Sequence, residues 1–221
     1  MKTIWDFIKN NLAKPFAQKP KNVVKMLIAV TVMGMGVAIL RLTSFGPDPC
    51  SAMNYGMSYI TGMSFGNYQI LFNIVLFTAI FLIDRSLLGL GTFGNMIICG
   101  YAADFTSWVI FKIFNVTRVT VTWERIVIML PALILFVFAA AIYMNCDLGT
   151  APYDAAAFLI HKAISKKHKA SFKLVRIIYD GLVTVFAFFI KGEVGLVTVL
   201  MIFTLGPAVD FVGKNIGKKK Q

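Results

Sequence analysis

Four polar residues lie in segments that are otherwise apolar and long enough to cross a membrane, and two of them, Asn73 and Asp180, lie well inside. Gln69 and Asn73 fall in one such segment, and Arg176 and Asp180 fall in another in the second half of the chain. A charged side chain at the centre of a bilayer costs at least about 2.5–3.5 kcal/mol, so it is usually paired or functional. Arg176 precedes Asp180 by one helical turn, which puts both on one face. These residues predict either a clamp on a small polar solute or a structural ion pair, and the two amides would also suit hydrogen bonds between helices.

Two apolar segments stop at a glycine with a proline three residues further on. The first ends in FGPDP (residues 45–49) and the second in LGTAP (residues 148–152). Glycine accepts unusual backbone angles and proline has no N–H, so both sites break a helix. A broken helix beside a carboxylate at membrane depth is typical of a transport site. The break residues are Gly46, Pro47, Pro49, Gly149 and Pro152, and the carboxylates beside them are Asp48 and Asp154.

An acid at such a break also has a structural explanation. If short helices begin at Pro49 and Pro152, then Asp48 and Asp154 lie in or before their first turns, where a carboxylate stabilises the helix dipole by about 0.3–1 kcal/mol. We weigh this capping role equally with ligand binding. The predicted substrate-binding set comprises Asp48, Asn54, Gln69, Asn73, Asp154, Arg176 and Asp180.

Four further polar residues are secondary candidates for the binding site. Asp104 and Asp210 stand near the ends of the last long segment in each half. Each would bind a cation or a proton if it lined a cavity, or would be solvated near an interface, where Asp210 also has Lys214 one turn further on. Thr92 and Thr198 follow glycine-containing turns and are predicted N-caps more than ligands.

The sequence shows no metal-binding or catalytic set. His161 and His168 flank lysines without a third ligand at metal spacing. Cys50, Cys99 and Cys146 lie far apart in apolar surroundings, which predicts inert packing residues. We therefore expect no metal, no cofactor and no enzyme activity.

The composition is that of a membrane protein. The 221 residues are 58% apolar and 14% charged, with a mean hydropathy of +0.75. Soluble domains are about 45–50% apolar and about 25% charged, so we predict an all-α polytopic membrane protein. The net charge of +12 is concentrated in residues 1–25, in the loop around Lys166 and at the C-terminus. Lysines that flank apolar spans indicate cytoplasmic ends beside anionic lipid, and no nucleic-acid-binding pattern accompanies them.

The apolar segments define the predicted domains. Long segments near the roughly 17–25 residues of a membrane helix alternate with two short helical segments, Cys50–Thr61 and Tyr153–Ile164. The long segments are 26–45, 67–83, 92–114, 124–143, 171–190 and 194–211. The predicted domains are 1–25, a basic amphipathic interfacial segment or mobile tail; 26–115, the first membrane repeat; 116–123, a linker; 124–213, the second repeat; and 214–221, a basic tail.

The two membrane segments repeat each other. Polar and glycine residues recur in the same order at nearly constant spacing, which predicts tandem homologous repeats. The matching pairs are Gly46 with Gly149, Pro49 with Pro152, Asn73 with Asp180, Thr92 with Thr198, Gly100 with Gly206 and Asp104 with Asp210. Each repeat would hold three full transmembrane helices and one short intramembrane or crossing helix.

The order of these motifs resembles that of the bacterial YitT/YczE-type membrane proteins. A span with Gly34, Gly36 and Ala38 precedes FGPDP, and the equivalent span precedes LGTAPYD. In both halves there follows a short helix and then the motif SFG or ASF. An Asn or Asp lies within the next span, and GLGT or GLVT precedes GxxxD after it. The likeness covers residues 26–213 and implies an inner-membrane protein of two repeats whose activity is largely unassigned. The second copy departs from the pattern at Lys173 and Arg176, so the two halves need not share one role.

Two arrangements of the short segments stay open. If they re-enter the membrane, each half crosses three times and the repeats are inverted, as in many secondary transporters. If they cross, the repeats are parallel. Segment length favours re-entry, whereas the positive-inside rule slightly favours crossing, because the Arg118 loop then lies on the side of the basic termini. Both arrangements place the N- and C-termini in the cytoplasm of a bacterial inner membrane.

We expect a secondary permease for a small solute that works by alternating access between the repeats. The first alternative is a non-transporting membrane helper that binds a lipid or a partner protein. A remote alternative is an intramembrane aspartyl-type enzyme, suggested by Tyr179, Asp180 and Asp210, although the glycine motif of such proteases is absent. Membrane lipids and the solute are the expected partners. The cargo, direction, coupling ion and homo-oligomeric state stay open.

Overall fold

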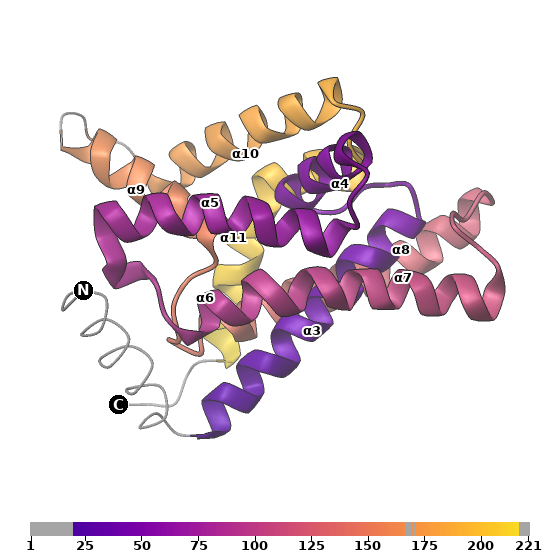
Figure 1. Cartoon of the computed structure of the whole chain (residues 1–221), viewed down its shortest axis with the longest axis horizontal. Coiled ribbons are helices and arrows are strands. Elements are labelled where there is room, and N and C mark those ends of the chain that lie inside the picture. The colour runs from indigo at the N-terminus through magenta and orange to yellow at the C-terminus, as the bar shows by residue number, and fades with distance from the viewer. Residues whose placement is uncertain (1–19, 167–168, 170, 217–221) are drawn as a thin grey trace.

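The computed structural model describes residues 20–166, 169 and 171–216, with the side chains of 210 and 213–216 left out. Within these ranges every regular element is helical (Figure 1). The predicted N-terminal segment and C-terminal tail fall largely outside the described residues. The elements are α3 (Pro20–Leu42), α4 (Pro49–Thr61), α5 (Phe65–Asp84), η1 (Arg85–Leu87), α6 (Leu90–Gly94), η2 (Asn95–Cys99), α7 (Gly100–Phe114), α8 (Thr122–Met144), α9 (Pro152–Ser165), α10 (Phe172–Phe189) and α11 (Leu196–Ile216).

The two short helices begin as the sequence predicts. Pro49 and Pro152 occupy the first turns of α4 and α9, where a missing N–H costs nothing. Asp48 is the N-cap of α4 and its side chain accepts a hydrogen bond from Ser51 N–H. Asp154 lies inside the first turn of α9. The α4 helix ends at Gly62, which adopts the left-handed conformation, a common helix stop.

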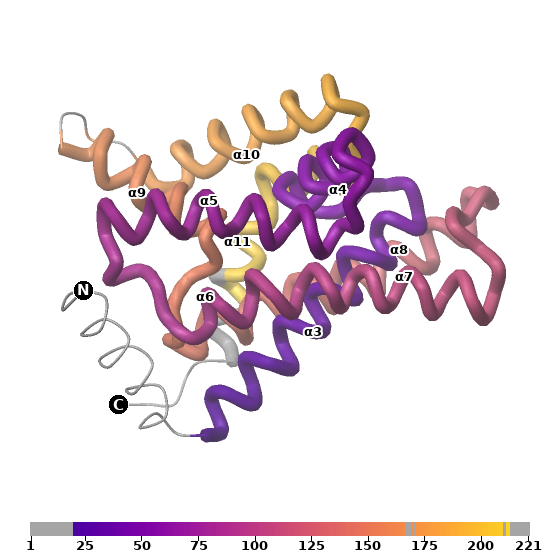
Figure 2. The backbone as a smooth tube through the Cα atoms, in the orientation of Figure 1, coloured from indigo at the N-terminus to yellow at the C-terminus, as the bar shows by residue number. Residues whose placement is uncertain are grey.

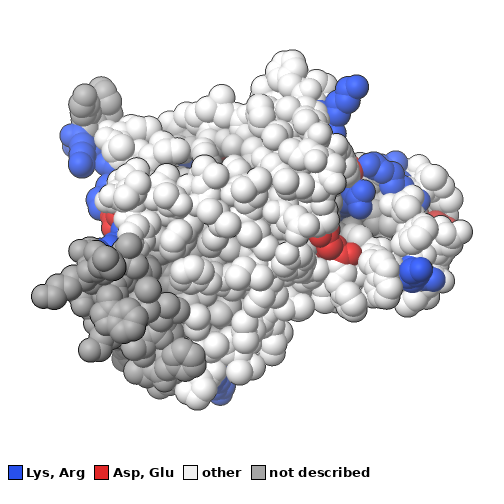
Figure 3. Space-filling view, in the orientation of Figure 1, with Lys and Arg blue, Asp and Glu red and all other residues white. Residues whose placement is uncertain are grey.

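Among the described residues, four stretches are long and apolar enough to cross a membrane: 20–42, 65–87, 90–114 and 122–144. The predicted fifth and sixth spans differ from these. The α10 helix carries Lys173, Arg176 and Asp180, and the apolar part of α11 runs only from Leu196 to Val209. On the face drawn in Figure 3, charged atoms gather at the two ends and the lower edge, and a broad uncharged band lies between them.

The α3 helix is the packing centre. It contacts α8 along one face and α7 and η2 along another. A Cβ at Gly34 would lie 2.3 Å from the Cys99 carbonyl oxygen, and one at Gly36 would lie 3.0 Å from Phe136 Cβ. The helices therefore approach each other closely at these two glycines, where a side chain would not fit.

Helices from the two halves of the chain lie side by side. The short helix α4 packs on α10, and the short helix α9 packs on α5 (Figures 1 and 2). In Figure 1, α3 and α7 run from left to right and α5 runs back, whereas α10 runs from left to right and α11 returns. The start of α3 and the end of α11 both lie in the lower part of this view.

Each helix break is completed by the other half of the chain. Gly46 has a φ of +84° and lies against Gly195 and Thr198, and the Phe45 carbonyl accepts a hydrogen bond from Val197 N–H at 2.9 Å. Likewise the Leu148 carbonyl accepts one from Gly91 N–H at 2.6 Å. The breaks at Gly46 and Gly149 are thus fixed by the loops that precede α11 and α6.

Candidate functional site

A pocket of about 260 Å³ lies between the helices. Residues of α3, α4, α5, η2, α8, α9, α10 and α11 line it, and most are apolar. Pockets for small molecules are usually about 300–1,000 Å³, mostly apolar with a few placed polar groups, so this one suits a small ligand. Its polar lining residues include Asp48, Ser51, Gln69, Asn73, Asn95, Tyr153, Asp154, Lys173 and Arg176.

Arg176 is the centre of a charged network on one wall of the pocket. Its Nη1 donates to Asp154 Oδ1 at 2.6 Å, and its Nε donates to Asp180 Oδ2 at 2.8 Å. The other oxygen of Asp180 accepts from the Tyr153 hydroxyl at 2.7 Å. Arg176 and Asp180 lie on one face of the helix as predicted, and they form the ion pair that was one of the two alternatives. Asp154 is a second partner from a different helix. Asp180 lies behind Arg176 and is buried.

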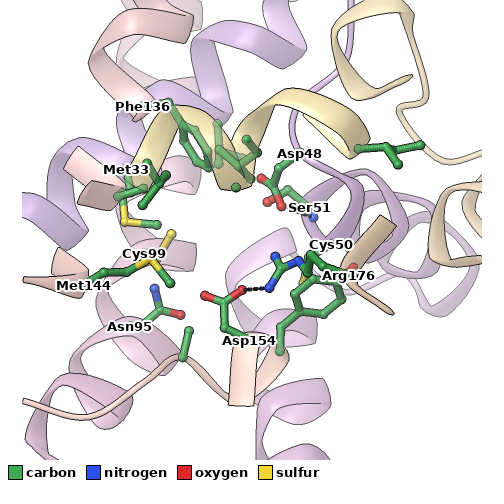
Figure 4. A pocket seen from close by; sticks show the side chains of 18 of the residues that line it. Met33, Asp48, Cys50, Ser51, Asn95, Cys99, Phe136, Met144, Asp154 and Arg176 are labelled. Atoms are coloured by element: carbon green, nitrogen blue, oxygen red, sulfur yellow. Dashed lines mark hydrogen bonds and ion pairs between the residues drawn. The ribbon is translucent and has the colours of Figure 1, made fainter. Parts of the chain in front are cut away.

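Asp48 lies on the pocket without a cationic partner. Its Oδ2 accepts Ser51 N–H at 3.1 Å. Its Oδ1 is buried and has no hydrogen-bond partner among the described residues. Figure 4 shows Asp48, Asp154 and Arg176 at the pocket, with the ion pair drawn between the last two. Asp48 therefore caps α4 with one oxygen only.

Neutral amides supply another part of the lining. Gln69 and Asn73 on α5 are both buried and line the pocket with Asn95. No hydrogen bond joins the Asn73 or Asn95 side chain to another described residue, so these amides are available to a ligand. Asn95 and Cys99 bound the π-helical turn η2, a distortion that is frequent at functional sites. The amides of the first half thus face the pocket together with the charges of the second.

The pocket extends toward one end of the molecule. On α10 its lining residues are Phe172, Lys173, Arg176 and Ile177, all in the first two turns. On α11 they lie between Ile202 and Val209, and none comes from the first turn of that helix. The pocket therefore reaches the beginning of α10 and not the loop between α10 and α11.

A second ionic cluster occupies the opposite end. Glu193, in the α10–α11 loop, is buried. It accepts hydrogen bonds from Arg118 Nη2 at 2.6 Å, from Arg41 Nε at 3.3 Å and from the Tyr59 hydroxyl. The Arg41 guanidinium also stacks over the Tyr55 ring at 4.8 Å. This cluster joins the ends of α3 and α4 and the α7–α8 loop to the second half of the chain.

Several predicted residues lie away from the pocket. Asn54 is buried within α4, with its Nδ2 3.7 Å from Cys50 Sγ and its Oδ1 unpartnered among the described residues. Asp104 accepts Gly66 N–H at 2.9 Å in the first turn of α5. The Asp210 side chain is outside the described set.

The two threonines are structural in a way that differs from the prediction. Thr92 is the third residue of α6, not its N-cap, and its hydroxyl accepts Gly89 N–H and donates to the Thr150 carbonyl. Thr198 holds the equivalent place in α11 and accepts Gly195 N–H at 3.2 Å. Both hydroxyls bond the backbone of the turn before the helix. A glycine-containing turn followed by threonine therefore does not by itself identify the N-cap residue.

Sequence reasoning missed four polar residues that line the pocket, Ser51, Asn95, Tyr153 and Lys173, and also the acid of the second cluster, Glu193. Tyr153 and Ser51 follow the two breaks directly and could have been found from that position. Asn95 has no such signal, because the π-turn that directs it is not visible in the sequence. Glu193 lies in a short loop, and its partners come from distant segments.

These features define a helical membrane protein with a mostly apolar pocket between its helices, into which a few polar groups are placed. The chain belongs to the family of unknown function DUF6198, whose model matches residues 20–214. It is similar to an uncharacterized protein of Haemophilus influenzae, with 26% identity over 194 residues, 86% of this chain and 83% of the relative. It is also similar to the uncharacterized protein YyaS of Bacillus subtilis, with 24% identity over 178 residues, 79% of this chain and 84% of the relative. No solved structure matches the chain. The resemblance to YitT/YczE-type proteins is consistent with bacterial relatives and stays a prediction.

Proposed function

We propose that this protein is a secondary permease for a small solute. The observation that carries the proposal is the pocket, where two broken helices begin beside Asp48, Asp154 and Arg176. Half-helices whose ends meet ionisable groups inside a membrane protein are a recurrent form of transporter binding site. Ionisable groups at this depth are expensive to keep, which favours a functional reason for them.

The proposed architecture is a pair of inverted repeats, residues 26–115 and 124–213. The reciprocal hydrogen bonds support it, because the Phe45 carbonyl is bonded by Val197 as the Leu148 carbonyl is bonded by Gly91. The packing of α4 on α10 and of α9 on α5 supports it in the same way. An exchange of this kind is expected for two similar units related by a two-fold axis.

We place α4 and α9 as re-entrant helices, in preference to the crossing that charge placement slightly favours. They have 13 and 14 residues, which is roughly 20 Å at 1.5 Å per residue. The hydrocarbon core is about 30 Å thick. Both helices also begin at the pocket and not at an end of the molecule. Both chain termini would then lie on one side, which the basic N-terminal residues assign to the cytoplasm of a bacterial inner membrane.

Alternating access would proceed by opening one end of the pocket while the other closes. The pocket reaches the first turns of α10, on the proposed cytoplasmic side. The Glu193 cluster joins both halves at the far end, where it would close the pocket. We therefore propose that the conformation described here is a state open toward the cytoplasm.

The pocket favours transport over a helper that only binds a lipid or a partner protein, because a helper needs no internal polar space. The aspartyl-type enzyme is not favoured, because Asp180 is bonded to Arg176 and Tyr153, whereas such enzymes need two carboxylates that share a proton. We propose no catalytic activity.

The test is transport by the purified full-length chain in liposomes. A panel of small metabolites and ions should contain at least one solute with saturable uptake or efflux, and Arg176→Ala should abolish it. Lys162 on α9 provides the control, since it pairs with Asp84 and does not line the pocket. Lys162→Gln should transport normally. If no solute moved above the level of empty liposomes, the permease proposal would be lost.

A further inference from the structure

The carboxylate of Asp48 is the uncompensated charge of the pocket. The other two acids of the site, Asp154 and Asp180, both form ion pairs with Arg176. Asp48 forms no ion pair with a described residue, and its Oδ1 is buried without a hydrogen-bond partner among them. An acid withdrawn from water keeps its charge only when a cation or hydrogen bonds compensate it, and otherwise it binds a proton. Asp48 thus lacks the positive partner that its surroundings require.

We propose that the pocket binds a small organic cation whose ammonium group pairs with Asp48. This inference rests on the proposed permease function, because it names the chemical class of the solute. The ammonium group would balance the charge of the Asp48 carboxylate, which lines the pocket, and the uncharged part of the ligand would lie against the apolar lining.

The positive groups near the pocket do not favour an anion. Arg176 already donates to two carboxylates from its Nε and Nη1 atoms. The N-terminus of α4 is occupied by Asp48 itself. Lys173 is exposed in the first turn of α10, so water compensates its charge. An anion entering the pocket would meet the Asp48 carboxylate, and Lys173, the lining cation for which no ion pair with a described residue is found, lies at the exposed beginning of α10.

The remaining lining suits a cation with an apolar body. Phe136 is buried on α8, and the rings of Phe158 and Phe172 stack with centroids 4.5 Å apart. Aromatic faces attract ammonium groups. Pro207 has no N–H, so the Phe203 carbonyl lacks its usual helical partner, and both residues line the pocket. The volume of about 260 Å³ limits the ligand to a small molecule.

The experiment measures binding to the full chain in lipid nanodiscs, with no transport step. The probes are ammonium ions of increasing size, from methylammonium through tetraethylammonium to benzyltrimethylammonium, with benzoate and benzyl alcohol as the anionic and neutral counterparts. We expect saturable binding of at least one ammonium ion and none of benzoate or benzyl alcohol. If all the ammonium ions fail to bind at millimolar concentration, or if benzoate binds equally well, the proposal is overturned.

The decisive variant is Asp48→Asn. Asparagine is as good an N-cap as aspartate, so α4 should still form, whereas loss of a charge-assisted hydrogen bond should weaken ammonium binding roughly ten- to hundredfold. Asp84→Asn removes an acid outside the pocket and should bind the cation as the unchanged protein does. Equal cation affinity of Asp48→Asn and the unchanged protein would rule the assignment out.

A second measurement needs no change at Asp48. Cys50 lines the pocket two residues further on and is partly accessible, whereas Cys99 and Cys146 are buried. The bound ammonium ion should slow alkylation of Cys50 by a maleimide, and benzoate should not. Unaltered alkylation at a saturating ammonium concentration contradicts the proposal.

Binding and transport are separable outcomes. Ammonium binding that depends on Asp48, without uptake in liposomes, would retain the ligand class and refute the permease. Saturable uptake of an anion or a neutral solute that is indifferent to Asp48→Asn would retain the permease and refute the ligand class.

Discussion

Arg176 and Asp154 join two helices of the second half at the point where the short helix α9 begins. Their Nη1 and Oδ1 atoms are 2.6 Å apart, and each side chain is largely buried. The same guanidinium is bonded through Nε to Asp180, one helical turn further along α10. Arg176 thus fixes the first turn of α9 to α10. Because Asp154 and Asp180 bind the same guanidinium, the position of each carboxylate depends on the other.

Removal of Asp180 should strongly destabilise the protein. In Asp180→Ala, Arg176 keeps one partner and the buried Tyr153 hydroxyl loses its acceptor. Breaking a buried ion pair from one side costs about 3–5 kcal/mol. We expect a loss of this size in the free energy of unfolding, measured by titrating the protein in mixed micelles with SDS. Asp84→Ala breaks an exposed pair with Lys162 and should unfold nearly as the unchanged protein does; equal effects of the two changes would contradict this account.

The break at Gly46 should not accept alanine. A Cβ there would lie 2.2 Å from Thr198 Oγ1 and 2.6 Å from Gly195 N, and the φ of +84° is already unfavourable for other residues. We expect Gly46→Ala to leave little folded protein in the membrane, as judged by size-exclusion chromatography of detergent extracts. Gly62 provides the matched control, since it has a φ of +68° but no atom within 4 Å of an added Cβ. Gly62→Ala should cost only about 1–2 kcal/mol, so a milder effect at Gly46 than at Gly62 would refute the steric explanation.

Loss of the Glu193 charge should open the far end of the pocket. In Glu193→Gln, Arg41 and Arg118 face a neutral amide and no longer a carboxylate. In a chain with Cys99→Ala and Cys146→Ala, Cys50 reports on access to the pocket. We expect faster labelling of Cys50 by a membrane-impermeant maleimide added on the side of the α10–α11 loop.

The control for this experiment is the ion pair at the other end of the molecule. Asp84→Asn releases Lys162 without touching the Glu193 cluster, and labelling of Cys50 from the α10–α11 side should keep its original rate. Identical labelling of the Glu193→Gln and unchanged proteins would show that the cluster does not close the pocket.

Asp104 should behave as a helix cap and not as a ligand-binding residue. Its carboxylate accepts Gly66 N–H at the start of α5, so Asp104→Ala should cost about 0.5–2 kcal/mol of stability. Ammonium binding should be unchanged, because Asp104 does not line the pocket. Thermal unfolding and binding measured on one preparation decide the matter. A large loss of affinity at unchanged stability would return Asp104 to the binding residues.

Much of the fold could be predicted from periodic apolar segments and from their breaks. The predicted segment 67–83 corresponds to α5, and Cys50–Thr61 corresponds almost fully to α4. Arg176 and Asp180 were placed on one face because helical spacing alone determines that relationship. Their contact with Asp154 could not be predicted, because it depends on how α9 packs against α10.

The same limit explains the residues that the sequence did not identify. The partners of Glu193 come from the ends of α3 and α4 and from the α7–α8 loop, and no local pattern connects those segments. Asn54 fell in the right helix but on a face away from the pocket. Packing decides which face of a helix points into a bundle. In a short segment of mixed polarity, such as α4, the sequence does not indicate that face.

The hydrogen bond from Val197 to the Phe45 carbonyl has a consequence for biosynthesis. The ribosome makes Phe45 long before Val197, because most of the chain described here lies between these two residues. Until then, the beginning of α4 is without the contacts that fix it in the finished protein. A chain cut between residues 115 and 122 should therefore yield a stable protein only when both pieces are produced in the same cell. Each piece supplies the backbone N–H group, Gly91 or Val197, that bonds the helix break of the other piece.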